Sequence, residues 1–200
     1  MSGELFESKE VEIKDAGAEK ISKKGTAFSV RTIVYIGLFA AITSVCALIS
    51  FQTPWGVSFT LHTFAVALSA FCLGKWKGTL TTFIYVLIGF IGVPVYSNFT
   101  AGPAKLFGIT GGYIWSFILM TFLCGVGIET KKKWSTMLFS ILGLIVCYIC
   151  GMAQFMLITK LGFGESFMMT IAPYVMKDVV SIFAAYGLSI PMKKAMHLNE

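Results

Sequence analysis

Charged residues are scarce in this sequence. Among its 200 residues only 13% are Asp, Glu, Lys or Arg and 56% are hydrophobic, whereas soluble domains carry about 25% charged residues. The mean hydropathy is +0.79, and a soluble fold of this size would still expose roughly 30% of the surface of its unfolded chain. The composition therefore excludes an ordinary cytosolic enzyme and predicts a protein embedded in lipid.

A polar disulfide framework is absent. All five Cys residues lie in apolar stretches, including the Cys-x-x-Cys pair formed by Cys147 and Cys150. A redox or metal site would need polar neighbours and accessible thiolates. We therefore interpret these thiols as packing groups, because a free Cys behaves as a small hydrophobe.

Motifs for catalysis and nucleotide binding are missing as well. The sequence has no Gly-x-x-x-x-Gly-Lys-[Ser/Thr] phosphate loop and no Gly-x-Ser-x-Gly or paired-His signature. It contains two His residues without an adjacent carboxylate, so no metal site is expected. We predict that the chain is not an enzyme, carries no cofactor and does not hydrolyse ATP by itself.

The few charges are unevenly distributed. Residues 1–30 hold five Lys and six acidic residues, and residues 31–200 hold 11 Lys or Arg and four acidic residues. The first 30 residues lack the apolar core of a signal peptide, so we predict a polar cytosolic tail that is disordered or loosely helical. The remaining basic residues form short clusters between apolar runs, a pattern typical of membrane topology signals rather than of a nucleic-acid-binding surface.

Long apolar runs fill the region from residue 31 to 194, which we predict to be an all-α integral membrane domain. Helices of about 20 apolar residues cross a bilayer. Six transmembrane helices are predicted, at residues 31–51, 58–73, 79–93, 110–128, 134–158 and 173–192. The second and third are short, which implies a locally thinned bilayer or loops that dip into the protein.

Lys and Arg residues near the ends of the runs predict the orientation, because they collect on the cytosolic side. With the amino terminus in the cytosol, eleven of them face inward and three, Lys105, Lys160 and Lys177, face outward. We therefore predict that both termini are cytosolic and that the outer loops are at about residues 52–60, 94–109 and 159–172.

Polar side chains within apolar runs are functional candidates, since they are costly at membrane depth. Asp178 is the only carboxylate inside a predicted span, about two turns into the sixth helix if Pro173 takes its first position. The neighbouring Lys177 could form a local ion pair or extend to the outer interface. His62 could be a proton relay, a ligand contact or a histidine satisfied by a backbone carbonyl.

Three further features depend on small or polar residues. Asn98 and Tyr96 directly follow the third run, on the same outer side. Residues 108–113, Gly-Ile-Thr-Gly-Gly-Tyr, open the fourth run and could cradle an anion or allow a close approach of a loop. Small residues four apart in the first run form a smooth helix face for internal packing or for a partner subunit. They are Gly37, Ala40, Ala41 and Ser44.

Four motifs, at residues 58–66, 89–96, 108–113 and 173–178, resemble in order and spacing those of the BioY family. Members of this family are the biotin-binding S components of energy-coupling-factor (ECF) transporters. The resemblance covers about residues 31–194, and its most specific elements are Gly-Val-Pro-Val-Tyr and Thr-Gly-Gly-Tyr. It implies a six-helix S-component bundle in the bacterial cytoplasmic membrane that takes up biotin from the outer face.

The resemblance also implies partners. Family members work with a transmembrane coupling subunit and two cytosolic ATPases, which would explain the missing phosphate loop. Small residues on the first helix of such subunits contact the coupling protein, which favours docking as the role of the Gly37, Ala40, Ala41 and Ser44 face.

Biotin contains a ureido ring with two N–H donors and a carbonyl acceptor, an apolar thioether ring and a carboxylate. The resemblance implies that Asp178 accepts the ureido N–H groups and that Asn98 completes the polar end. Lys177 would serve either the carboxylate or Asp178. Aromatic residues would form the apolar wall that such pockets require, and these are Trp55, Tyr96, Tyr113 and Tyr174.

The sequence departs from the family pattern at several positions. His62 stands where Gln is common and Ile109 where Pro is common. Lys177 and Ser181 replace the family's Gly and Lys, one helical turn apart, so a lysine moved by one turn could still reach the pocket. We include His62 and Ser181 in the predicted binding set.

Two other functions stay open. The chain could be an S component for another vitamin, such as thiamine or riboflavin. It could also be a stand-alone carrier in which Asp178 and His62 relay protons, and uptake would then need no partner and would depend on the proton gradient.

Overall fold

Apolar helices form most of the described chain, which comprises residues 29–51, 53–54 and 57–196 of a computed structural model. Within these residues, α2, α5, α6 and α8 are long and apolar enough to cross a membrane. The prediction of a mainly helical membrane protein is thus confirmed, but the count of six spans is not. The α-helices are α2 (Val30–Leu48), α3 (His62–Ile91), α4 (Pro103–Leu106), α5 (Gly111–Glu129), α6 (Lys133–Thr159), α7 (Phe163–Thr170) and α8 (Val175–Ala195).

The helix α3 is a hairpin of two shorter helices. At Gly74 the backbone has φ 77° and ψ −176°, a region that L side chains rarely adopt. The ring centroids of His62 and Tyr85 lie 4.8 Å apart, whereas a straight helix would separate these residues by about 35 Å. The chain therefore reverses at Gly74. The predicted turn at residues 74–78 is shorter than expected, because the helix resumes at Lys75.

Substitution of Gly74 by Ala is expected to destabilise this hairpin. A side chain at the observed φ and ψ costs of order 1–3 kcal/mol, and thermal unfolding in detergent measures the loss. Gly187→Ala is the control, since a Cβ there meets no atom within 4 Å and Ala favours a helix over Gly. A midpoint for Gly74→Ala at or above that of the wild type would contradict the hairpin.

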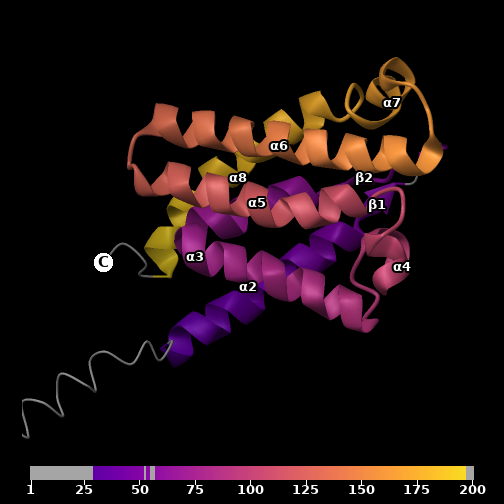
Figure 1. Ribbon diagram of the computed structural model, residues 1–200. Helices are drawn as coiled ribbons and strands as arrows, with labels where there is room; N and C mark the ends of the chain where they lie inside the picture. The colour runs from indigo at the N-terminus through magenta and orange to yellow at the C-terminus, as the bar shows by residue number, and fades with distance from the viewer. Residues whose placement is uncertain (1–28, 52, 55–56, 197–200) are drawn as a thin grey trace, which may run out of the picture. The chain divides into compact units, whose positions relative to one another are not determined.

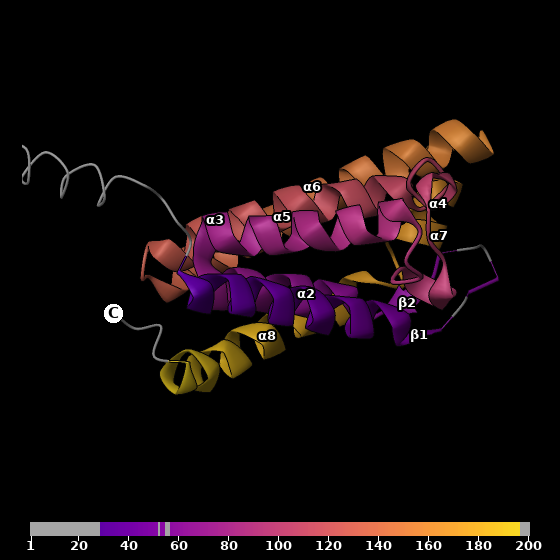
Figure 2. The ribbon, with the colours of Figure 1, turned by 90° about the horizontal axis from the view of Figure 1, so that it is seen from below.

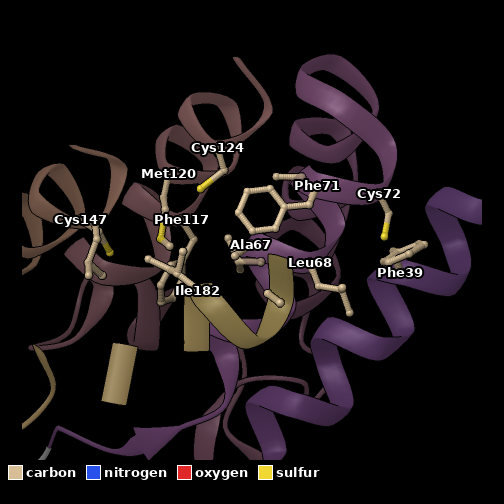
Figure 3. Close-up of a cluster of buried hydrophobic side chains, with 14 of the residues drawn as sticks. Phe39, Ala67, Leu68, Phe71, Cys72, Phe117, Met120, Cys124, Cys147 and Ile182 are labelled. Atoms are coloured by element: carbon tan, nitrogen blue, oxygen red, sulfur yellow. The ribbon is translucent and has the colours of Figure 1, made fainter. Parts of the chain in front are cut away.

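Residues from Val34 onward form one compact unit, in which α5 lies between α3 and α6 and α8 packs along α3 (Figures 1 and 2). Figure 3 shows its largest buried hydrophobic cluster, which joins α2, α3, α5, α6 and α8. Cys72, Cys124 and Cys147 are buried in this cluster, and all five Cys residues are free thiols. This placement supports the interpretation of these three thiols as packing groups.

Short elements gather at one end of the helices, which we call the loop end (Figure 2). Strand β1 (Ser50–Phe51) pairs antiparallel with β2 (Phe59–Thr60), and η1 (Ser97–Phe99), α4 and α7 lie in the other connections. These elements were not predicted, because they are too short to show a period. The predicted polar tail, residues 1–30, lies almost wholly outside the described residues.

Candidate ligand-binding site

A pocket at the loop end is lined by residues of α3, α5, α6, α7 and α8 and of the connections between helices. The volume that the centre of a water molecule can occupy inside the pocket is about 80 Å³. By the same measure, a cavity that holds a single water molecule needs about 10–15 Å³. Its polar side chains come from α3, α6 and α8 and from the N-cap of α5. They include His62, Thr110, Tyr148, Lys177 and Asp178. The rest of the lining is mainly aromatic and aliphatic.

Asp178 is the acidic group of this pocket, and its side chain is buried. Its Oδ2 accepts a hydrogen bond of 2.7 Å from the Tyr148 hydroxyl. Its Oδ1 lies 2.5 Å from the Lys177 ammonium, with which it forms an ion pair. Helix α8 begins at Val175, so the expectation that Pro173 is its first residue is wrong. Asp178 lies in the first turn instead, where the helix dipole favours a carboxylate.

Lys177 joins α8 to the β1–β2 hairpin. Its ammonium donates a hydrogen bond of 2.7 Å to the Thr60 carbonyl and lies 5.0 Å from the centroid of the Phe59 ring. The side chain is only 14% exposed. Of the alternatives for Lys177, the geometry therefore favours the ion pair with Asp178 over an extension to the outer interface.

Three of the predicted aromatic residues line the pocket, and each uses its hydroxyl to bind a backbone carbonyl. Tyr174 donates to Val57 at 2.6 Å, and Tyr96 donates to Val86 at 2.6 Å. Tyr113 donates to the carbonyl of Thr170 at 3.4 Å. Burial raises the pKa of Tyr96 to about 12, so its hydroxyl remains a donor throughout the neutral range. The rings thus offer apolar surface to the pocket, while Trp55 lies outside the described residues.

Asn98 and Ser181 do not line the pocket. The Asn98 amide donates to the Ser58 hydroxyl at 2.9 Å and accepts from the Ser50 hydroxyl at 3.1 Å. Ser58 itself lines the pocket. Asn98 therefore lies outside the pocket lining and supports it through this hydrogen bond to Ser58. Ser181 is buried and lines a separate apolar groove beside α8, together with Lys177.

His62 lies in the pocket wall between two aromatic rings. Its ring centroid is 4.8 Å from that of Tyr85 and 4.2 Å from that of Phe117. Its Nε2 is buried and has no hydrogen-bond partner among the described residues. The Nε2 of His62 is therefore available to a bound molecule.

Comparison with known proteins decides the family. The model of the BioY family matches residues 19–198 of the chain. The chain belongs to the BioY family. It is 36% identical over 158 residues to the "Probable biotin transporter BioY" of Pyrococcus horikoshii, covering 78% of this chain and 91% of that one. It is also 36% identical over 166 residues to the "Biotin transporter BioY" of Thermotoga maritima, covering 82% and 96%.

A solved structure supports the BioY fold. The S component for biotin from an ECF-type ABC transporter matches with a TM-score of 0.75 at 19% identity, covering 82% of this chain and 92% of that one. At this identity the match shows the fold. The BioY resemblance inferred from the loop motifs is thus confirmed, and the chain is a multi-pass membrane protein of a transporter family.

Three polar residues at the site of this BioY protein were not predicted. Tyr148 binds Asp178, and Thr110 lines the pocket with a buried hydroxyl. Gln154 donates hydrogen bonds to the carbonyls of Leu106 and Gly108, at 3.1 and 2.7 Å. An amide inside an apolar run is the same signal that marked Asp178, so Gln154 could have been identified from the sequence.

The small residues of α2 do not form a single exposed face in this BioY protein. Gly37 and Ala41 are exposed, but Ala40 is buried. The Ser44 hydroxyl donates to the Ala40 carbonyl at 2.9 Å. The predicted docking surface is therefore reduced to the pair Gly37 and Ala41, four residues apart on the accessible side of α2.

Proposed function

We propose that this chain captures biotin in the pocket at the loop end and serves as the S component of an ECF-type transporter. The observation that carries the proposal is the Asp178 carboxylate, which is buried in the pocket of a BioY protein and is held there by the Tyr148 hydroxyl and the Lys177 ammonium. A carboxylate is the acceptor that the two N–H groups of a ureido ring require. The protein catalyses no covalent reaction in this role.

The rest of the pocket complements the rest of the ligand. The rings of Tyr113 and Tyr174 supply apolar surface for the thioether ring and the aliphatic chain, as is usual for small-molecule sites. Lys177 forms an ion pair with Asp178, and the Nε2 of His62 has no hydrogen-bond partner among the described residues. Asn98 acts through Ser58, which it holds at the pocket wall.

The proposed membrane arrangement has six crossings with both termini in the cytosol. The two halves of α3, on either side of Gly74, add two short spans to the four long apolar helices. The loop end then faces outward and the basic residues at 75, 77 and 131–133 face inward, as the distribution of positive charge requires. Labelling of single Cys residues placed at 105 and 132 with a membrane-impermeant maleimide tests this, and only the former should react in intact cells.

We assign Gly37 and Ala41 to the contact with the transmembrane coupling subunit, which acts with two cytosolic ATPases. A Cβ at Gly37 would meet no atom within 4 Å, so a side chain added there begins in open space and would obstruct a partner helix. Gly37→Leu is expected to lower uptake by the full complex at least fivefold and to leave biotin affinity unchanged. Gly187→Leu, also at an open position, is the control, and equal uptake by both variants would contradict the assignment.

Uptake of radiolabelled biotin tests the transport role and separates it from the two alternatives. A biotin auxotroph that contains this chain, the coupling subunit and the ATPases should accumulate biotin, and cells that lack the ATPases should not. Uptake by the chain alone that a protonophore abolishes would favour the proton-coupled carrier. Accumulation of radiolabelled thiamine or riboflavin by the same cells, without accumulation of biotin, would favour another vitamin.

A further inference from the structure

The hydroxyl of Thr110 is buried and forms no hydrogen bond within the part of the chain that the structure describes. Thr110 is the N-cap of α5, with φ −108° and ψ 2°, and its side chain makes no capping hydrogen bond. A Thr at this position normally accepts a hydrogen bond from the second or third backbone N–H of the helix. Here Oγ1 is buried without a partner among the described residues, and the residue is only 9% exposed.

The hydroxyl of Thr110 belongs to the wall of the pocket described above. A buried polar group without a partner destabilises a protein, so its retention here is explained if a bound molecule completes the hydrogen bond. The amino-terminal end of a long helix favours electronegative atoms, and α5 has 19 residues. These two observations point to an oxygen acceptor as the group that Thr110 meets.

Gln154 fixes the segment that carries Thr110. From α6 its amide donates to the carbonyls of Leu106 and Gly108, the last of which is only two residues before Thr110. Helices α5 and α6 are in close contact here, because a Cβ on Gly112 would lie 2.9 Å from the Gln154 Cβ. Gln154 therefore determines where the Thr110 hydroxyl stands, without being one of the residues that line the pocket.

We propose that Thr110 donates a hydrogen bond to an oxygen atom of bound biotin and that Gln154 is its positioning residue. The proposal rests on the biotin-binding function stated above, and it adds a second polar contact to that of Asp178. Biotin offers two acceptor sites of this kind, the ureido carbonyl and the carboxylate. Asp178 would bind hydrogen-bond donors of biotin and Thr110 an acceptor, so the pocket recognises both kinds of polar group.

Biotin titration of purified variants in detergent tests the role of Thr110. Thr110→Val keeps the shape and removes the hydroxyl, and we expect its affinity to fall about tenfold, or about 1.4 kcal/mol. Thr110→Ser keeps the hydroxyl and should stay within threefold of the wild type. Thr110→Ala is the second variant in case Thr110→Val does not fold. Thr159→Val is the matched control, because among the described residues the Thr159 hydroxyl bonds within α6, to the Phe155 carbonyl.

A double-mutant cycle tests whether Gln154 acts through Thr110. Gln154→Met keeps the length of the side chain and removes the amide donors. We expect it to lower affinity three- to tenfold in the wild type and less than twofold in Thr110→Val, since coupled residues are non-additive. A loss that is equal in both backgrounds would overturn the positioning role, because a general loss of structure is additive.

Biotinol, in which the carboxylate is reduced to an alcohol, identifies the oxygen. If Thr110→Val costs the same affinity for biotinol as for biotin, the contact is with the ureido carbonyl. If the cost disappears with biotinol, the contact is with the carboxylate. Wild-type affinity of Thr110→Val for biotin would overturn the proposal while leaving the biotin-binding function intact, whereas failure of the wild type to bind biotin would overturn that function.

Discussion

Replacement of Asp178 by Ala is expected to weaken biotin binding about a hundredfold, equivalent to about 2.7 kcal/mol. The substitution removes the carboxylate that is buried in the pocket and that is proposed to accept the ureido N–H groups. It also leaves the ammonium of Lys177, which lies 2.5 Å from Asp178, as an uncompensated buried charge. Titration of the purified protein with biotin, together with its thermal unfolding midpoint, measures both effects.

Two further variants separate the charge of Asp178 from its shape. Asp178→Asn keeps an oxygen acceptor for the Tyr148 hydroxyl but lacks the charge, so its affinity should lie between those of Asp178→Ala and the wild type. Lys177→Gln should weaken binding less than Asp178→Ala, because Lys177 is mainly a partner of Asp178 and of the Thr60 carbonyl. Wild-type affinity of both Asp178 variants would rule out the carboxylate as the ureido-binding group.

Replacement of Gly111 by Ala is expected to give the second large effect, a combined loss of stability and of binding. An added Cβ would overlap the carbonyl of Leu106 and approach the Gln154 amide nitrogen to 2.7 Å. Overpacking of this kind costs about 1–3 kcal/mol, which corresponds to a drop of roughly 2–12 °C in the unfolding midpoint. Thr110 and Tyr113 flank this glycine and line the pocket, so biotin affinity should fall at least tenfold.

Gly187→Ala is the matched control for this substitution, because Gly187 is also helical and has no neighbour within 4 Å of an added Cβ. Its midpoint should equal or exceed that of the wild type, and its biotin affinity should be unchanged. If Gly111→Ala behaved like Gly187→Ala, the close approach of the α4–α5 turn to α6 would be wrong.

The long helices could be predicted from the sequence because charged or polar residues bound their apolar runs. The predicted spans 110–128 and 134–158 agree within one residue with α5 and α6, since the Lys residues at 131–133 separate them. Agreement is poorer where local chemistry decides. Helix α8 begins two residues after Pro173, and α3 resumes directly after Gly74 despite two Lys residues in its next turn.

The site could be predicted in part, through residues that are unusual where they stand. Asp178, Lys177 and His62 are polar groups in apolar surroundings, and the structure brings all three to one pocket. The hydrogen bond between Tyr148 and Asp178 joins positions 30 residues apart on different helices. The sequence alone does not show which sides of two helices pack together, so this pair could not be predicted. Asn98 was predicted as a direct contact, but only the structure shows that Ser58 lies between it and the pocket.

Mass spectrometry of the small molecules that co-purify with the detergent-solubilised protein tests whether this chain captures biotin. The protein should be purified from cells grown with biotin, thiamine and riboflavin, beside Asp178→Ala as the control. Biotin should be the retained vitamin, at close to one molecule per chain in the wild type and much depleted in Asp178→Ala. Retention of thiamine or riboflavin, or biotin retained equally by both proteins, would contradict this expectation.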